Sequence, residues 1–241
     1  MKSLRNICAA IGVTTNDISV IRHFYGYWQR RVPAALVGAP STVSVLDQIE
    51  ALEGRHFHVN VIRVGSDNFT ANDIDEIDEA IHLTRTAYRK GGMGLGRIEH
   101  YVISVAQANG LDQLTSNADA EQLTADWTVP NDGQDLFFVL SWTGNTLGRS
   151  NIEGPCDKND DSDGQTGIIT AMTSSRQETG HTTAHELGHY LGLTHRNQDA
   201  SNLMAQTSAV NNLGGTINTA TIIDSGQQLE ISDHCSVQAG I

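Results

Sequence analysis

The sequence predicts a mixed fold of helices and strands, in which a twisted mixed sheet is crossed by one helix. Three observations support it: several apolar segments are typical of strands, one long amphipathic helix follows the first of them, and a histidine-rich segment has helical spacing. The chain has 241 residues, of which 39% are hydrophobic, enough for one sizeable core.

Composition excludes several classes of function. The chain carries 15 Lys+Arg against 28 Asp+Glu, a net charge of −13, whereas phosphate binding requires an excess of basic residues. No apolar run approaches the roughly 20 residues that a membrane span needs. We therefore expect no nucleic-acid partner and no membrane span, and we favour a monomer.

Residues 1–54 are expected to form an N-terminal helical segment, either a propeptide or an extension. Its predicted helices, 18–28 and 43–52, are separated by Pro33 and Pro40. The first thirteen residues are too short and too polar for a clear signal peptide.

Two elements begin the domain that we place at 55–241. In 56–64, the apolar residues Phe57, Val59 and Val61 alternate with polar ones, which predicts a half-buried strand. A helix follows, with acidic residues at its start, basic residues at its end and Gly91-Gly92 as its stop. One face of this helix carries Ile74, Ile77, Ile81, Thr84 and Tyr88.

Further strands are predicted at 97–108, 135–142 and 167–172, the second of them central and buried. Between them, 109–134 is polar and is expected to be a surface excursion. The glycine-rich 91–96 lacks the lysine of a phosphate loop, so we expect a flexible connection there.

One motif predicts the chemistry of the chain. His185 and His189 are four residues apart, so a helix places both imidazoles on one face, where both reach one ion. Glu186 is adjacent, where its carboxylate can hold a water without binding the metal. Gly192 allows the sharp turn that returns His195 as the third ligand. Three imidazoles leave the fourth position open, as in catalytic zinc sites.

Two alternatives accompany this interpretation. The whole motif could be a helix that carries histidines by coincidence, although five matching positions in eleven argue against that. His181 lies one turn before His185, and we expect a surface residue there rather than a further ligand.

The motif formed by His185, Glu186, His189, Gly192 and His195 resembles that of the metzincin zinc endopeptidases. Met204, nine residues after His195, is similar to their methionine turn at a matrixin-like spacing, with a core methionine as the alternative. The resemblance implies an α+β catalytic domain with a five-stranded sheet, an active-site helix, an upper lobe (55–192) and a smaller C-terminal lobe (193–241).

The resemblance also implies a reaction. Zn²⁺ on the three histidines would activate a water and polarise the scissile carbonyl, with Glu186 as general base. A protein or peptide substrate would pair with an edge strand near 146–151. Residues 225–238 would form a closing helix, with Leu229 and Ile231 packing inward and Cys235 near its end. Departures remain: Arg196 follows the third histidine, and no tyrosine stands two residues after Met204.

A calcium ion and a disulfide are further candidates. Asn159, Asp161, Asp163 and Gly164 resemble the front of a calcium loop without its glutamate, and a solvated acidic turn is the alternative. Of the three cysteines, either Cys156 pairs with Cys235, which the chain-entropy model values at roughly 4 kcal/mol, or all remain reduced.

Three hypotheses for function follow: a zinc endopeptidase, a metzincin-fold zinc-binding module without turnover, and a narrow-specificity effector or toxin protease. Retention of Glu186 argues against the module, because a structural zinc site needs no base. A secreted or extracellular location is the expectation.

Overall fold

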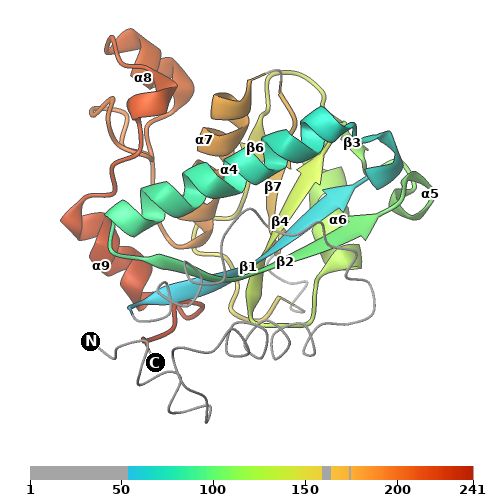
Figure 1. Cartoon of the computed structure of the whole chain (residues 1–241), viewed down its shortest axis with the longest axis horizontal. Helices are drawn as coiled ribbons and strands as arrows, with labels where there is room; N and C mark the ends of the chain where they lie inside the picture. Colours follow the sequence, from blue (N-terminus) through green and yellow to red (C-terminus); the bar gives the residue numbers. More distant parts are fainter. Residues whose placement is uncertain (1–53, 159–163, 174, 241) are drawn as a thin grey trace, which may run out of the picture.

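The computed structural model describes residues 54–158, 164–173 and 175–240. They form a mixed α+β fold on a five-stranded sheet of order β2-β1-β4-β7-β6 (Figure 1). All strands are parallel except β6, which pairs antiparallel with β7 at one edge. The predicted mixed sheet crossed by a helix is therefore confirmed. Its strands are β1 (His56–Val64), β2 (Gly94–Ile103), β4 (Gly133–Val139), β6 (Gly148–Arg149) and β7 (Ile168–Ala171).

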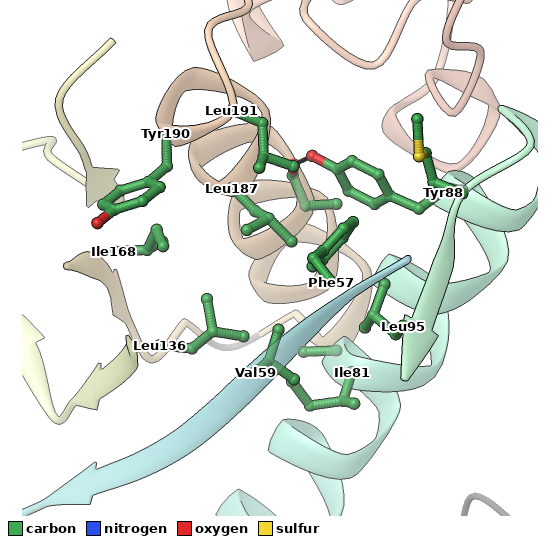
Figure 2. Packing of buried hydrophobic residues seen from close by; sticks show 14 of the residues in the cluster. Phe57, Val59, Ile81, Tyr88, Leu95, Leu136, Ile168, Leu187, Tyr190 and Leu191 are labelled. Carbon is green, nitrogen blue, oxygen red and sulfur yellow. Dashed lines mark hydrogen bonds between the residues drawn. The ribbon is translucent and has the colours of Figure 1, made fainter. Parts of the chain in front are cut away.

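Helices cover both faces of this sheet. Helices α4 (Ala71–Lys90) and α7 (Arg176–Tyr190) share one apolar core with Phe57 and Val59 (Figure 2). Helix α6 (Asn117–Trp127) shares the second core with Ile62 and Val64. His58 and Asn60, polar residues of β1, are also buried, and Arg63 is partly buried. The prediction of a half-buried β1 is therefore wrong, because a parallel strand in this position is covered on both sides.

Helices α4 and α7 run in the same direction in close contact. Near their N-terminal ends, Thr179 Oγ1 donates to Glu76 Oε1 at 2.6 Å. Further along both helices, Tyr88 Oη, near the end of α4, donates to the Ala184 carbonyl in the middle of α7 at 3.0 Å. Between these bonds, a Cβ on Gly180 would collide with Leu83. A glycine at this position thus permits the close approach of α7 to α4.

Between residues 91 and 134, three expectations differ from the structure. Strand β2 begins at Gly94, so the end of the expected flexible connection is strand. The strand also ends earlier than expected, and Val105–Ala108 form helix α5. The predicted surface excursion contains α6, whose Ala120 and Leu123 are fully buried, so that expectation is wrong. A second, two-stranded sheet pairs β3 (Gln113–Leu114) with β5 (Ser141–Trp142).

The C-terminal segment, residues 193–240, is mostly irregular and lies to one side of the sheet (Figure 1). Ile231 is buried in its last helix, as predicted, but Leu229 is 69% exposed and does not pack inward. That helix is also shorter than expected and ends before Cys235. The remaining helices of the described chain are α8 (Thr207–Asn212), α9 (Ser225–Asp233) and the short 3-10 helices Ser66–Asn68 and Ile217–Thr219. Among the helices described, none has the length and apolar character needed to cross a bilayer.

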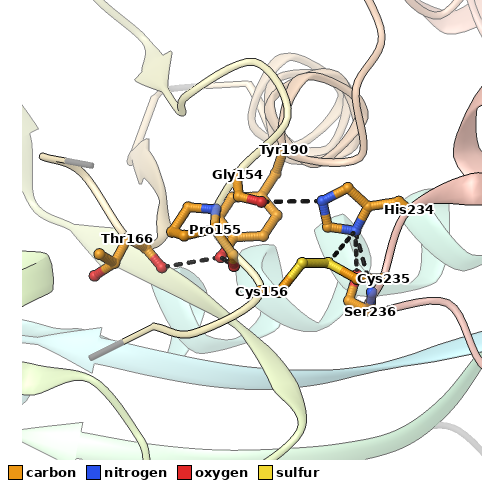
Figure 3. Close-up of a disulfide and its surroundings, with 8 residues drawn as sticks. All are labelled: Gly154, Pro155, Cys156, Thr166, Tyr190, His234, Cys235 and Ser236. Carbon is orange, nitrogen blue, oxygen red and sulfur yellow. Dashed lines mark hydrogen bonds between the residues drawn. A yellow bond between two sulfur atoms is a disulfide. The ribbon is translucent and has the colours of Figure 1, made fainter. Parts of the chain in front are cut away.

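A disulfide joins Cys156 to Cys235, with a Cα–Cα distance of 5.9 Å (Figure 3). The paired alternative for these cysteines is therefore confirmed. Beside it, His234 Nε2 donates to the Gly154 carbonyl at 3.1 Å, and Tyr190 Oη donates to the Pro155 carbonyl at 2.9 Å. The disulfide and these bonds tie the C-terminal segment to the end of α7.

Replacing Cys156 and Cys235 by serine is expected to lower the free energy of unfolding by about 4 kcal/mol, because the bond closes a loop with a sequence separation of 79. Guanidinium denaturation of the wild type, with and without reductant, and of the double variant measures it. Reductant should leave the variant unchanged. Equal denaturation midpoints for oxidised wild type and variant would contradict the prediction.

Candidate metal centre

Three histidine side chains converge where α7 ends. Helix α7 presents His185 and His189 on one face, and both are buried, whereas His195 is exposed beyond the helix. One ligand atom from each lies within 4.8 Å of the other two. His189 Nε2 and His195 Nε2 are 3.1 Å apart. The structure thus brings together the three predicted ligands, and they could hold a metal ion.

Backbone carbonyls fix the orientation of two of these imidazoles. His185 Nδ1 lies 2.9 Å from the Leu203 carbonyl oxygen, and His189 Nδ1 lies 2.7 Å from that of Leu193. A carbonyl only accepts, so each ring carries its proton on Nδ1 and turns the lone pair of Nε2 to the centre. Lone pairs that face one another favour a cation between them, so the donor set fits a metal ion.

Burial keeps these histidines in the form that binds metals. Desolvation lowers the pKa of His185 to about 3, and the neighbouring histidines add to this effect. Desolvation also lowers the pKa of His189 and that of His195. All three imidazoles are therefore neutral near pH 7, with their lone pairs free for an ion.

Gly192 makes the turn that returns His195 to the helix. Its φ is +100°, which a residue with a side chain adopts only with strain. After this turn, Leu193 is fully buried, and its amide donates to the Gly188 carbonyl at 2.9 Å. The turn predicted at Gly192 is confirmed, and it also delivers the carbonyl that orients His189.

Met204 lies in a turn in which the Ala205 amide donates to the Asn202 carbonyl at 3.1 Å. Its side chain is fully buried against Gly188, where a Cβ would overlap the methionine sulfur. Its carbonyl accepts from the amide of Arg196 at 2.9 Å. Met204 therefore connects α7 to the residue after the third histidine, a position that suits the predicted methionine turn.

Glu186 is partly exposed and lies against the edge of the sheet. Ser150 Oγ donates to the Glu186 carbonyl at 2.6 Å and lies 3.3 Å from Glu186 Oε2. Desolvation raises the pKa of the Glu186 carboxyl to about 7, although Ser150 and Arg149 oppose the rise. A nearby cation would lower this pKa again. No local pattern in the sequence indicates the Ser150 contact, because strand pairing creates it.

His181 corrects one expectation. Only 7% of it is exposed, so it is not a surface residue. Helix α4 and residues 217–221 cover this side of α7. Its ring centroid is 5.7 Å from that of His185, yet it is not one of the three converging ligands. Desolvation lowers the pKa of His181 to about 4, so its imidazole is neutral as well.

Several predicted features lie outside the described residues. They include Asn159, Asp161 and Asp163 of the candidate calcium loop and the helices expected at 18–28 and 43–52. Gly164, the last residue of the candidate loop, is described and has a φ of +73°.

No family model and no curated protein matches this chain. Solved structures do resemble it. One, described as the structure of a chaperone-substrate complex, matches with a TM-score of 0.51 and 12% sequence identity. The match covers 76% of this chain and 35% of the other, so this chain spans about a third of that chain's length. At this identity, the similarity concerns the fold alone.

Substitution of His185 by alanine should abolish zinc retention, because two imidazoles hold the ion far more weakly than three. His181→Ala, one helical turn away, is the matched control and should keep about one zinc per chain. Metal analysis after dialysis against zinc-containing buffer gives both values. Full zinc in His185→Ala would contradict the assignment.

The loss of zinc affinity on acidification is expected to begin only below about pH 6.5. Protons compete with the metal only when pH falls towards the pKa of the ligands, and burial lowers all three below 6.5. Competition with a chromogenic chelator at each pH measures the dissociation constant. A steep loss of affinity already between pH 7 and 6.5 would show that the ligands titrate normally.

Proposed function

We propose that this chain is a zinc-dependent endopeptidase with a metzincin-like catalytic domain. The observation that carries the proposal is the convergence of His185, His189 and His195 without a fourth His, Cys, Asp or Glu in the group, as far as the described chain goes. A structural zinc site closes with four protein ligands, whereas three histidines leave a position for water or substrate. The exposure of His195 supports access to that position.

A bound zinc ion supplies Lewis acidity, which activates water and polarises a carbonyl group. Glu186 supplies the proton transfers: its carboxylate accepts a proton from the attacking water and donates it to the leaving amine. Its partial exposure lets it meet the water, while Ser150 holds both its carbonyl and its side chain. A base fixed on a helix beside the three imidazoles is what peptide hydrolysis needs and a storage site does not.

The edge of the sheet suits an extended peptide. Strand β6 is the last strand in the order and pairs only with β7 among the described strands. Its outer side leaves main-chain groups for a substrate strand to pair with. Ser150 follows β6 directly and contacts Glu186, so a peptide on this edge would run past the proposed base. This supports the expectation that residues 146–151 form the substrate edge.

Two further parts of the proposal rest on local features. The two-lobed division at residue 192 is supported by the turn at Gly192, after which the chain is mostly irregular. A secreted location is supported by the disulfide, because such bonds persist in oxidising compartments. The substrate is a protein or peptide, and zinc is the proposed cofactor.

Glu186→Gln should reduce the rate of peptide cleavage about 10²- to 10⁴-fold, because the amide cannot accept the proton. The substitution preserves the shape of the side chain, so zinc content and the denaturation midpoint should not change. Cleavage of a mixed peptide library, followed by mass spectrometry, gives the rates for both proteins. Equal cleavage by wild type and variant would reject Glu186 as the base, and zinc uptake without cleavage would favour the binding module.

A further inference from the structure

A cavity of about 230 Å³ lies beside the metal centre, between α4, α7 and residues 217–221. It shares a wall with the three-histidine site. Ala184 and Leu203 both line the cavity. Ala184 directly precedes His185, and the backbone carbonyl of Leu203 orients the His185 imidazole. The cavity therefore adjoins His185, the first of the three histidines.

The two ends of the cavity between α4 and α7 differ in chemical character. Because α4 and α7 run in the same direction, their lining residues follow the same order. Ala87 and Ala184 stand at the end next to the metal centre, with Leu203 beside them, and Glu79 and Gln177 stand at the far end. At 1.5 Å per residue, the step along α7 from Ala184 to Gln177 is about 10 Å. The near end is apolar and the far end carries a carboxylate.

Glu79 is the one side chain with a fixed charge among the described residues that line the cavity, and no lysine or arginine is among them. Within the described part of the chain, no ion pair involves Glu79. His181 also lines the cavity, and its buried Nε2 has no hydrogen-bond partner there. Gln177 and Asn218 add amide oxygens that can accept hydrogen bonds. A donor with a positive charge would satisfy this set.

We propose, on the basis of the function proposed above, that this cavity receives a lysine or arginine side chain next to the scissile bond and that Glu79 selects it. The hydrocarbon stem packs against Ala184 and Leu203, and the cationic end lies near Glu79. The net charge of −13 adds a long-range attraction for basic peptides. Glu79 is thus a specificity-determining residue with no part in the hydrolysis itself.

Binding to the zinc-loaded Glu186→Gln full chain tests this without turnover. The probes are two end-blocked alanine hexapeptides that differ in one residue, lysine in one and norleucine in the other, so that they differ only in the terminal ammonium group. Calorimetry should give at least about tenfold tighter binding of the lysine peptide, a typical gain from one charge-assisted hydrogen bond. Adding Glu79→Gln should remove that difference. Adding Asp75→Asn, which removes an exposed charge from the same helix outside the cavity, should preserve it.

Glu79→Lys should reverse the preference, so that a peptide with glutamate at the same position binds better than the lysine peptide. Equal binding of lysine and norleucine peptides, or no binding of either, would overturn the proposal, as would a lysine preference that survives Glu79→Gln. Cleavage by the wild-type protein is measured separately. Lysine-selective binding without any cleavage would leave the cavity assignment intact and reject the endopeptidase function.

Discussion

Two carbonyl groups of the backbone decide the geometry of the metal centre. Those of Leu193 and Leu203 accept the Nδ1 protons of His189 and His185 and so turn both Nε2 atoms inward. Neither carbonyl would be in place without the local structure before it. Gly192, at a φ of +100°, brings Leu193 back to α7, and the turn at Asn202 places Leu203. The ligand set therefore depends on two turns as much as on the histidines.

The rest of the fold makes this arrangement rigid on one side and open on the other. Below the centre, Met204 packs on Gly188, and the side-chain amides of Asn202 and Gln227 bond to each other at 2.8 and 3.1 Å. Tyr88 of helix α4 reaches the same part of α7, close to Gly188, and donates to the Ala184 carbonyl. Above the centre, His195 is exposed and Glu186 is partly so. Rigid ligands with access for a substrate are a combination that suits catalysis better than storage.

Periodic features of the sequence predicted the frame of the molecule and the centre of the site. The apolar spacing of α4 and the four-residue spacing of His185 and His189 are local, so the chain alone reveals them. The errors concern partners that are distant in sequence. The small residues of helix α6, such as Ala120, give no clear apolar pattern. The burial of His181 and the exposure of Leu229 depend on neighbours that the local sequence does not specify. Ser150 gave no signal, because its contact with Glu186 exists only after β6 has paired with β7.

The central claim is that three histidines hold zinc and leave one position for a ligand from outside the chain. X-ray absorption at the zinc edge of the metal-loaded protein tests it directly. We expect three imidazole nitrogens at about 2.0–2.1 Å and one oxygen from solvent. A fourth imidazole, as from His181, or a sulfur ligand at about 2.3 Å would contradict it, because a closed site could not act on a substrate.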